Sequence, residues 1–138
     1  MLARHGTLRK QDKDSLLAFE MKCYRRILQV CWQQRITNVE IRRRVGNKKN
    51  IVQLIMERKL NLFGHICRMK DERLVKGVMF GIMEGQAQRG RPNREWLDDI
   101  REWCQEDIHT LSWIAQDRTQ WRQIIRSALD TNGREPTE

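Results

Sequence analysis

The side chains that could do chemistry in this sequence of 138 residues are carboxylates, histidines and cysteines. Asp98–Asp99 is an acidic pair at the predicted start of a helix. Neighbouring side chains on a helix point about 100° apart, so this pair alone is a poor ligand for two metal ions. We interpret both residues as surface carboxylates that favour the positive end of the helix dipole.

Neither the histidines nor the cysteines form a recognisable catalytic or metal-binding pattern. His5, His65 and His109 have no cysteine or carboxylate at the spacing of a triad, and His65 is typical of a hydrogen-bonded structural residue. The cysteines lack a C-x-x-C pair, which favours reduced core thiols over a zinc site: Cys23, Cys31, Cys67 and Cys104. A phosphate-binding loop motif is also missing. We therefore expect no catalytic residue, no metal and no cofactor.

A binding function has more support than catalysis, because the excess positive charge is concentrated in the first 60 residues. The chain carries a net charge of +9. Residues 1–60 hold 15 Lys/Arg against 5 Asp/Glu, whereas residues 61–138 hold 12 against 13. Positive charge of this kind raises affinity for RNA or DNA by neutralising phosphates and releasing counterions. An ordinary solvated surface or an acidic protein partner would explain the same charge. The candidate nucleic-acid-binding residues are Lys22, Arg25, Arg26, Arg42, Arg43, Arg44, Lys48, Lys49, Arg89 and Arg91.

The densest cluster contains five positive charges within residues 42–49. It lies in and just after a short capped helix that follows a tight turn, an arrangement similar to a helix–turn–helix. The helix is brief and has no Asn/Gln pattern suited to reading bases. Contact with backbone phosphates is the interpretation that we adopt.

Arg89-Gly90-Arg91-Pro92 matches the core of an AT-hook, whose arginines enter a narrow minor groove. Few basic residues flank this motif, and a basic linker before a helix explains the same four residues. The five tryptophans could stack on bases. Because most lie on apolar helical faces, we predict that they pack in the core: Trp32, Trp96, Trp103, Trp113 and Trp121.

The elements that position these residues are predicted to be helices, since only two prolines and eight glycines interrupt the chain. We expect an all-α bundle of about five short amphipathic helices, or two subdomains hinged near the RGRP loop. The expected parts are a disordered arm (1–14), a basic helical subdomain (15–83), a basic loop (84–92), a C-terminal helical pair (93–129) and a disordered tail (130–138).

Local signals refine these helices. Thr37 with Glu40 forms a predicted capping box for helix 38–45, and Gly46 suits the left-handed position after it. A third helix is predicted over 50–69, where Gly64 suggests a close neighbour. Residues 74–83 fit a helix or an extended segment, and Asn93 and Thr110 are predicted to cap the last two helices.

Six sequence blocks occur in an order that resembles the region downstream of the polymerase domain in non-LTR (LINE-type) retrotransposon reverse transcriptases. They cover residues 15–126 and read FEMxCYRRIL (19–28), RITNxEI (35–41), RKLxxFGHIxRM (58–69), RGRP (89–92), WLDDI (96–100) and AxDRxxWR (115–122). The parent family consists of RNA-directed DNA polymerases with an endonuclease. The polymerase's metal-binding motif is absent, so the resemblance transfers no catalytic residue.

The resemblance implies a non-catalytic tail that helps a polymerase to hold RNA or DNA. The chain would then be a fragment of a longer frame, a co-opted piece, a helical module that docks on the polymerase domain of a related element, or a non-functional relic. No segment approaches the length of a membrane span or of a signal core. We expect a nuclear or cytoplasmic protein that is neither secreted nor in contact with a membrane.

Overall fold

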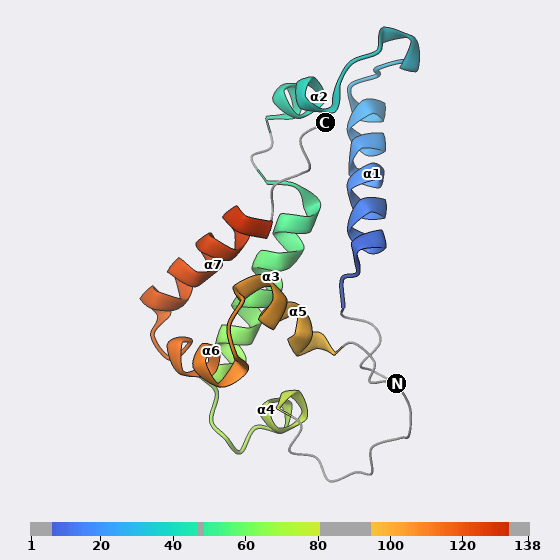
Figure 1. Cartoon of the computed structure of the whole chain (residues 1–138). Helices are drawn as coiled ribbons and strands as arrows, with labels where there is room; N and C mark the ends of the chain where they lie inside the picture. Colours follow the sequence, from blue (N-terminus) through green and yellow to red (C-terminus); the bar gives the residue numbers. More distant parts are fainter. Residues whose placement is uncertain (1–6, 47–48, 81–94, 133–138) are drawn as a thin grey trace. The chain divides into compact units, whose positions relative to one another are not determined.

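The computed structural model describes residues 7–46, 49–80 and 95–132. These residues form seven α-helices and one short 3₁₀ helix, without a strand, so the predicted all-α class is confirmed and the expected count of about five helices rises to seven (Figure 1). The elements are α1 (Lys10–Ile27), η2 (Trp32–Gln34), α2 (Asn38–Val45), α3 (Ile51–Cys67), α4 (Leu74–Met79), α5 (Trp96–Cys104), α6 (Ile108–Ile114) and α7 (Arg118–Asn132).

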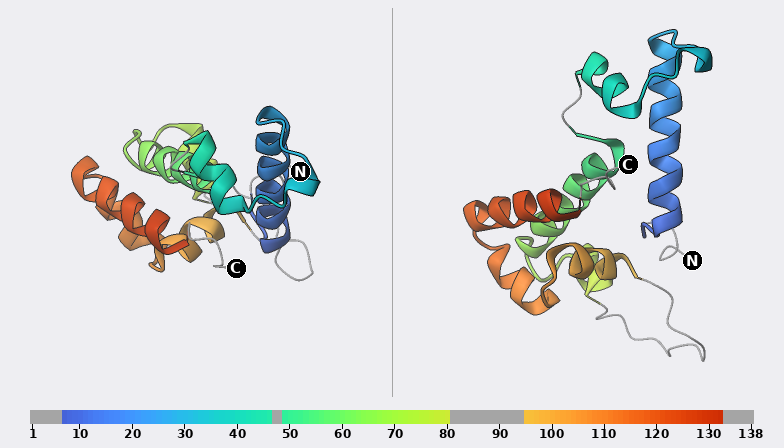
Figure 2. Two further views of the ribbon diagram at one scale, coloured as in Figure 1. Left: turned by 90° about the horizontal axis from the view of Figure 1, so that it is seen from above. Right: turned by 45° about the horizontal axis from the view of Figure 1, so that its top comes forward.

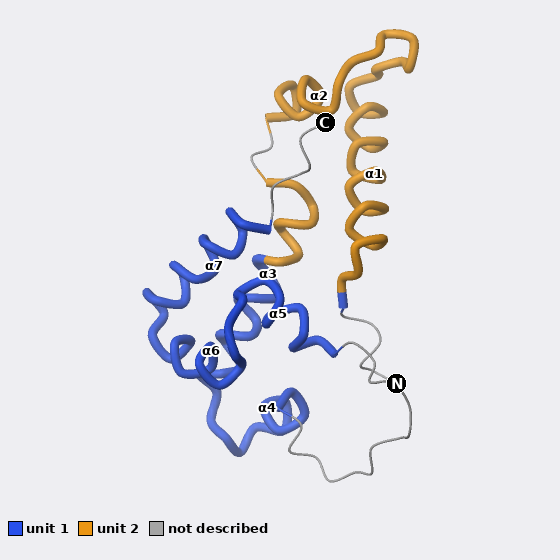
Figure 3. Tube along the Cα trace, in the orientation of Figure 1, with its two compact units in different colours: residues 1–7, 57–138 blue, residues 8–56 orange. Residues whose placement is uncertain are grey.

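The chain divides into two compact units (Figure 3). Unit 2 contains residues 8–56, and unit 1 contains residues 1–7 and 57–138. The division falls within α3, and residues 81–94 lie outside the described residues, so the hinge predicted at 84–92 has no support. Unit 2 has twelve Lys/Arg and four Asp/Glu, a net charge of +8, while unit 1 has fifteen and fourteen, a net charge of +1.

Helix α1 begins at Lys10, five residues before the predicted start at Ser15, so the predicted disordered arm (1–14) is too long. The reason is a cap that the apolar pattern did not reveal. The backbone N–H of Arg9 donates to Asp12 Oδ2 at 3.0 Å, and this bond satisfies a donor at the helix start.

Helix α2 follows its sequence signals closely. Thr37 Oγ1 accepts the backbone N–H of Glu40 at 3.4 Å, and Gly46 ends the helix at φ +75°, in the left-handed region that glycine adopts without strain. The predicted N-cap residue and terminus are confirmed, but only the Thr37 half of the predicted capping box is formed. The Glu40 carboxylate bonds to arginines further along the same helix.

Unit 2 is held together around a buried carboxylate. Glu20 Oε1 accepts the hydroxyl of Tyr24 at 3.0 Å and the backbone N–H of Ile51, the first residue of α3, at 2.9 Å. Helix α2 packs against the C-terminal half of α1 (Figures 1 and 2). The buried apolar side chains of this unit are Met21, Ile41, Val52 and Met56.

The C-terminal region contains three helices where the sequence predicted a pair. Asp107 caps α6 through the N–H of His109, and Asp117 caps α7 through the N–H groups of Thr119 and Gln120. Asp107 therefore starts α6 before the predicted cap Thr110, which lies inside that helix, and Asp117 divides the predicted last helix into α6 and α7. Helix α7 also extends to Asn132, three residues into the predicted tail.

Gly64 lies where α3 meets α7 inside unit 1. The indole N–H of Trp121 donates to the Leu60 carbonyl at 2.9 Å, and a Cβ on Gly64 would overlap that indole. The close neighbour predicted from the glycine is therefore Trp121. Phe63 packs beside the same ring, with centroids 5.4 Å apart.

Asp99 corrects the prediction of two surface carboxylates. Its side chain is fully buried and accepts Lys59 Nζ at 2.6 Å. The ammonium also lies 4.9 Å from the ring centre of Trp96 and 5.3 Å from that of Trp103. Two aromatic faces and a carboxylate thus replace the water that this cation loses on burial. Asp98 is only partly buried and caps α5.

Candidate nucleic-acid interface

The predicted basic residues on α1 point in two directions. Lys22 and Arg26 are exposed and lie one helical turn apart. Arg25 is partly buried and braces the chain after α1, because its Nη2 donates to Asn38 Oδ1 at 2.6 Å and to the Ile36 carbonyl at 3.4 Å. Lys22 and Arg26 can therefore face a ligand, whereas Arg25 already has a structural role.

The predicted cluster at residues 42–49 separates in a similar way. Arg42 is 22% exposed, and its Nη2 lies 3.6 Å from Glu20 Oε2, within the buried network of unit 2. Arg43 and Arg44 are more open, at 73% and 43%. Lys49 is also exposed. Three predicted residues lie outside the described residues: Lys48, Arg89 and Arg91.

Glu40 holds both Arg43 and Arg44. Its Oε2 accepts Arg43 Nε and its Oε1 accepts Arg44 Nε, each at 2.8 Å. The hydrogen bond from Arg43, reinforced by that from Arg44, lowers the pKa of the Glu40 carboxyl from 4.5 to about 2. The two arginines and one carboxylate therefore carry a net charge of +1 at neutral pH.

The carboxylates in this part of the sequence determine how much of its positive charge is available to bind phosphate. Residues 15–56 contain only two acidic residues, Glu20 and Glu40. The first is buried with Arg42, and the second is bound by Arg43 and Arg44. Along the sequence from residue 15 to residue 56, the exposed cations are therefore not interleaved with other carboxylates. We define Lys22, Arg26, Arg35, Arg43 and Arg44 as the exposed basic set of unit 2.

Arg35 was missed by the sequence analysis. It is exposed and adopts a left-handed backbone conformation (φ +45°) at the end of η2. A second omission is a line of exposed arginines on α7, Arg118, Arg122 and Arg126. Their four-residue spacing places them on one helical face, and this regular spacing was the signal that could have revealed them.

The tryptophans divide into three groups. Trp103 and Trp121 are buried, as predicted for core residues, and Trp96 is partly buried. The prediction is wrong for Trp32 and Trp113, which are 82% and 75% exposed. Trp113 lies off the face of α6 that carries the buried Leu111, and Trp32 lies in η2, beyond the end of the α1 helical face.

No group of metal-binding side chains occurs among the residues that the structure describes. The cysteines are free, and burial raises the pKa of the Cys104 thiol to about 12, so this thiol is protonated at neutral pH. Cys31 is exposed, contrary to the prediction of four core thiols, and His65 is exposed rather than structural.

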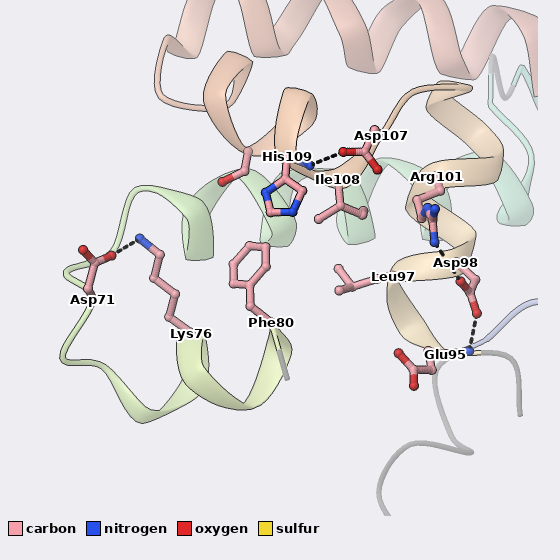
Figure 4. A pocket seen from close by; sticks show the side chains of 11 residues that line it. Asp71, Lys76, Phe80, Glu95, Leu97, Asp98, Arg101, Asp107, Ile108 and His109 are labelled. Carbon is pink, nitrogen blue, oxygen red and sulfur yellow. Dashed lines mark hydrogen bonds and ion pairs between the residues drawn. The ribbon is translucent and has the colours of Figure 1, made fainter. Parts of the chain in front are cut away.

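Unit 1 contains a pocket of about 670 Å³ between α4, α5 and α6 (Figure 4). Phe80, Leu97 and Ile108 supply its apolar lining. Four carboxylates line it against two cations, Lys76 and Arg101, and each cation is paired with one of these carboxylates. The acidic residues are Asp71, Glu95, Asp98 and Asp107. Excess negative charge repels phosphate, so this pocket is poorly suited to a nucleic acid.

Comparison of the chain with models of protein families, with curated proteins and with solved structures found no match in any of the three. Within the described ranges, none of the helices has the length and apolar character needed to cross a membrane.

Proposed function

We propose that this chain is a non-catalytic nucleic-acid-associated module, related to the tail of LINE-type retrotransposon reverse transcriptases, that contacts RNA or DNA backbone through the exposed basic set of unit 2. One observation carries the proposal. Both carboxylates within residues 15–56 are engaged by arginines, and Lys22, Arg26 and Arg35 are exposed. Uncompensated surface cations of this kind bind phosphates without reading sequence.

The experiment measures binding of a short duplex DNA and a short single-stranded RNA across a salt series. Lys22, Arg26 and Arg35 are changed together to glutamine. These residues suit the test better than Arg42, whose loss would leave the buried Glu20 carboxylate without its arginine. The variant should bind more weakly, and the slope of log affinity against log salt should fall by about 0.9 for each lost contact with duplex phosphate.

The matched control changes Arg118, Arg122 and Arg126 on α7 to glutamine. Both variants lose three exposed positive charges, so an effect of net charge alone would weaken binding equally. A local interface in unit 2 predicts a clearly larger loss for the first variant. Equal losses, or wild-type affinity in the first variant, would contradict the proposal.

A second candidate function is docking on a polymerase domain, and α4 supports it. Leu74, Val75 and Val78 on this six-residue helix are 70%, 53% and 56% exposed. Neighbouring apolar residues left open to water are a common feature of protein interfaces. Changing all three to serine should abolish co-sedimentation with the polymerase domain of a LINE-type element, while leaving affinity for nucleic acid unchanged.

A further inference from the structure

The loop between α1 and α2 presents one aromatic side chain to solvent. Trp32, at the start of η2, is 82% exposed. Burying a large apolar side chain stabilises the folded state, and the fold forgoes this contribution at Trp32. An open indole offers an apolar face with a polar N–H, and the surroundings of Trp32 distinguish it from the similarly exposed Trp113.

The loop is held in place rather than hanging free. At its start, the Val30 N–H donates to the Arg25 carbonyl at 2.9 Å, and at its end Arg25 donates to the Ile36 carbonyl and to Asn38. The Arg35 N–H closes η2 on the Trp32 carbonyl at 3.2 Å. Arg25 of α1 is therefore hydrogen-bonded to both ends of the turn that carries Trp32.

Backbone strain occurs on both sides of the same tryptophan. Gln29 and Arg35 have φ values of +53° and +45°, in the left-handed region that non-glycine residues rarely adopt. Both residues follow a helix end, as Gln105 (φ +54°) does after α5, so these left-handed conformations terminate the helices. Here they turn the chain sharply before and after Trp32, so that the indole is directed away from the core.

The charge around Trp32 selects the class of partner. Arg26 and Arg35 are exposed cations within six residues of it, and no acidic residue lies between Glu20 and Glu40 in the sequence. An indole beside cations matches a nucleic acid, whose bases stack on aromatic rings while its phosphates meet arginine. Tryptophan and arginine also occur together in protein interfaces, so a protein partner is one of the outcomes that the test separates.

We propose that Trp32 is a base-stacking platform for single-stranded RNA or DNA, with Arg26 and Arg35 holding the flanking phosphates. This inference rests on the proposed function and deepens it, because it assigns the strand state of the ligand and the residue that recognises it. Bases in a duplex are already stacked on one another, so the platform acts only on an unpaired strand.

The test compares Trp32→Ala with Trp113→Ala, a change of the same residue at a similar exposure (75%) in unit 1. Affinity is measured by fluorescence anisotropy for a labelled oligouridine, a labelled deoxythymidine oligomer and a DNA duplex. Trp32→Ala should weaken binding of both single strands by about 5- to 150-fold and leave duplex binding unchanged. Trp113→Ala should bind every probe as the wild type does. Trp32→Phe should recover part of the affinity, because it restores an aromatic face.

The salt series separates the two proposals. Trp32→Ala should leave the slope of log affinity against log salt unchanged, because it removes no phosphate contact. Wild-type affinity in Trp32→Ala, or equal losses on duplex and single strand, would overturn the stacking platform while the basic surface stands. If the wild type binds none of the probes at low salt, both proposals fail.

Loss of self-association in Trp32→Ala without a change in oligonucleotide affinity would instead identify a protein-binding surface. Matching thermal melts of the variants confirm that they are folded.

Discussion

Each compact unit has one buried carboxylate among the described residues, Asp99 in unit 1 and Glu20 in unit 2, and the two are neutralised differently. Asp99 is fully buried and pairs with Lys59, which lies between two tryptophan rings. Glu20 is neutralised by Arg42 together with hydrogen bonds from Tyr24 and a helix start. Unit 1 has a nearly balanced net charge of +1. Unit 2 has a net charge of +8, and several of its cations lie at the surface.

The comparison shows that sequence charge and available charge are different quantities. Unit 2 carries a net charge of +8, yet Arg25 and Arg42 serve its own fold, and Arg43 and Arg44 share Glu40. The charge that can meet a polyanion is therefore smaller than the formal value. Between residues 15 and 56 both carboxylates are already engaged by arginines, so they do not compete for the exposed cations there.

The largest expected loss of stability comes from a substitution in unit 1. Lys59→Met leaves Asp99 buried without its ammonium and should lower the free energy of unfolding by about 3–5 kcal/mol. The double variant Lys59→Met/Asp99→Leu removes both charges and should regain most of this loss, because apolar residues of similar volume can replace a buried pair. Urea denaturation followed by circular dichroism measures both. A double variant no more stable than the single one would show that the ion pair itself is required.

The corresponding change in unit 2 should be smaller and local. Glu20→Ala removes the acceptor for Tyr24 and Ile51 and should cost about 2–3 kcal/mol. Hydrogen exchange should report faster exchange in α1 and α2 than in the wild type, with α5 and α7 unchanged. Glu20→Gln keeps an acceptor oxygen and should cost less. Equal loss of protection in all four helices would mean that the two units unfold together.

Gly64 and Gly77 offer a comparison inside unit 1. Gly64→Ala forces a methyl group against the Trp121 indole, at an overpacking cost of about 1–3 kcal/mol, while alanine returns up to about 1 kcal/mol of helix propensity. The net loss should be about 1–2 kcal/mol. Gly77→Ala in α4 meets no atom within 4 Å and should stabilise by about 0.5–1 kcal/mol. Thermal melts distinguish the two, and stabilisation by Gly64→Ala would contradict the packing at Trp121.

The features that local chemistry specifies could be predicted from the sequence. The cap at Thr37, the glycine terminus at Gly46 and the bare position at Gly64 each depend on a residue type that few others can replace. The division of the predicted last helix into α6 and α7 was missed because Asp117 caps a helix within a continuous apolar pattern. Periodicity reports the buried face of a helix and gives less information about where the helix stops.

The tertiary partners of charged residues could not be predicted. Lys59 and Asp99 lie forty positions apart, and nothing near either residue indicates that both are buried. Trp32 and Trp113 were expected in the core from their residue type, yet they are exposed, because they lie off the packed helical faces. Of the ten predicted binding residues, Arg25 and Arg42 make structural bonds that depend on the packing of α2 against α1. Sequence spacing defines a helical face, but the packing decides what covers it.

The smallest expected change in stability comes from Glu40 in unit 2, and it depends on pH. Arg43 and Arg44 lower the pKa of its carboxyl from 4.5 to about 2, so the stability from this cluster is complete above pH 4.5 and is lost as the pH falls toward 2. The effect should be small and weaker in high salt, since both arginines are exposed. An NMR titration of the Glu40 carboxyl should give a midpoint near 2 in the wild type and near 4.5 in Arg43→Gln/Arg44→Gln. A wild-type midpoint near 4.5 would mean that the two arginines are not held by Glu40 in solution, and that both are open to a polyanion with their full charge.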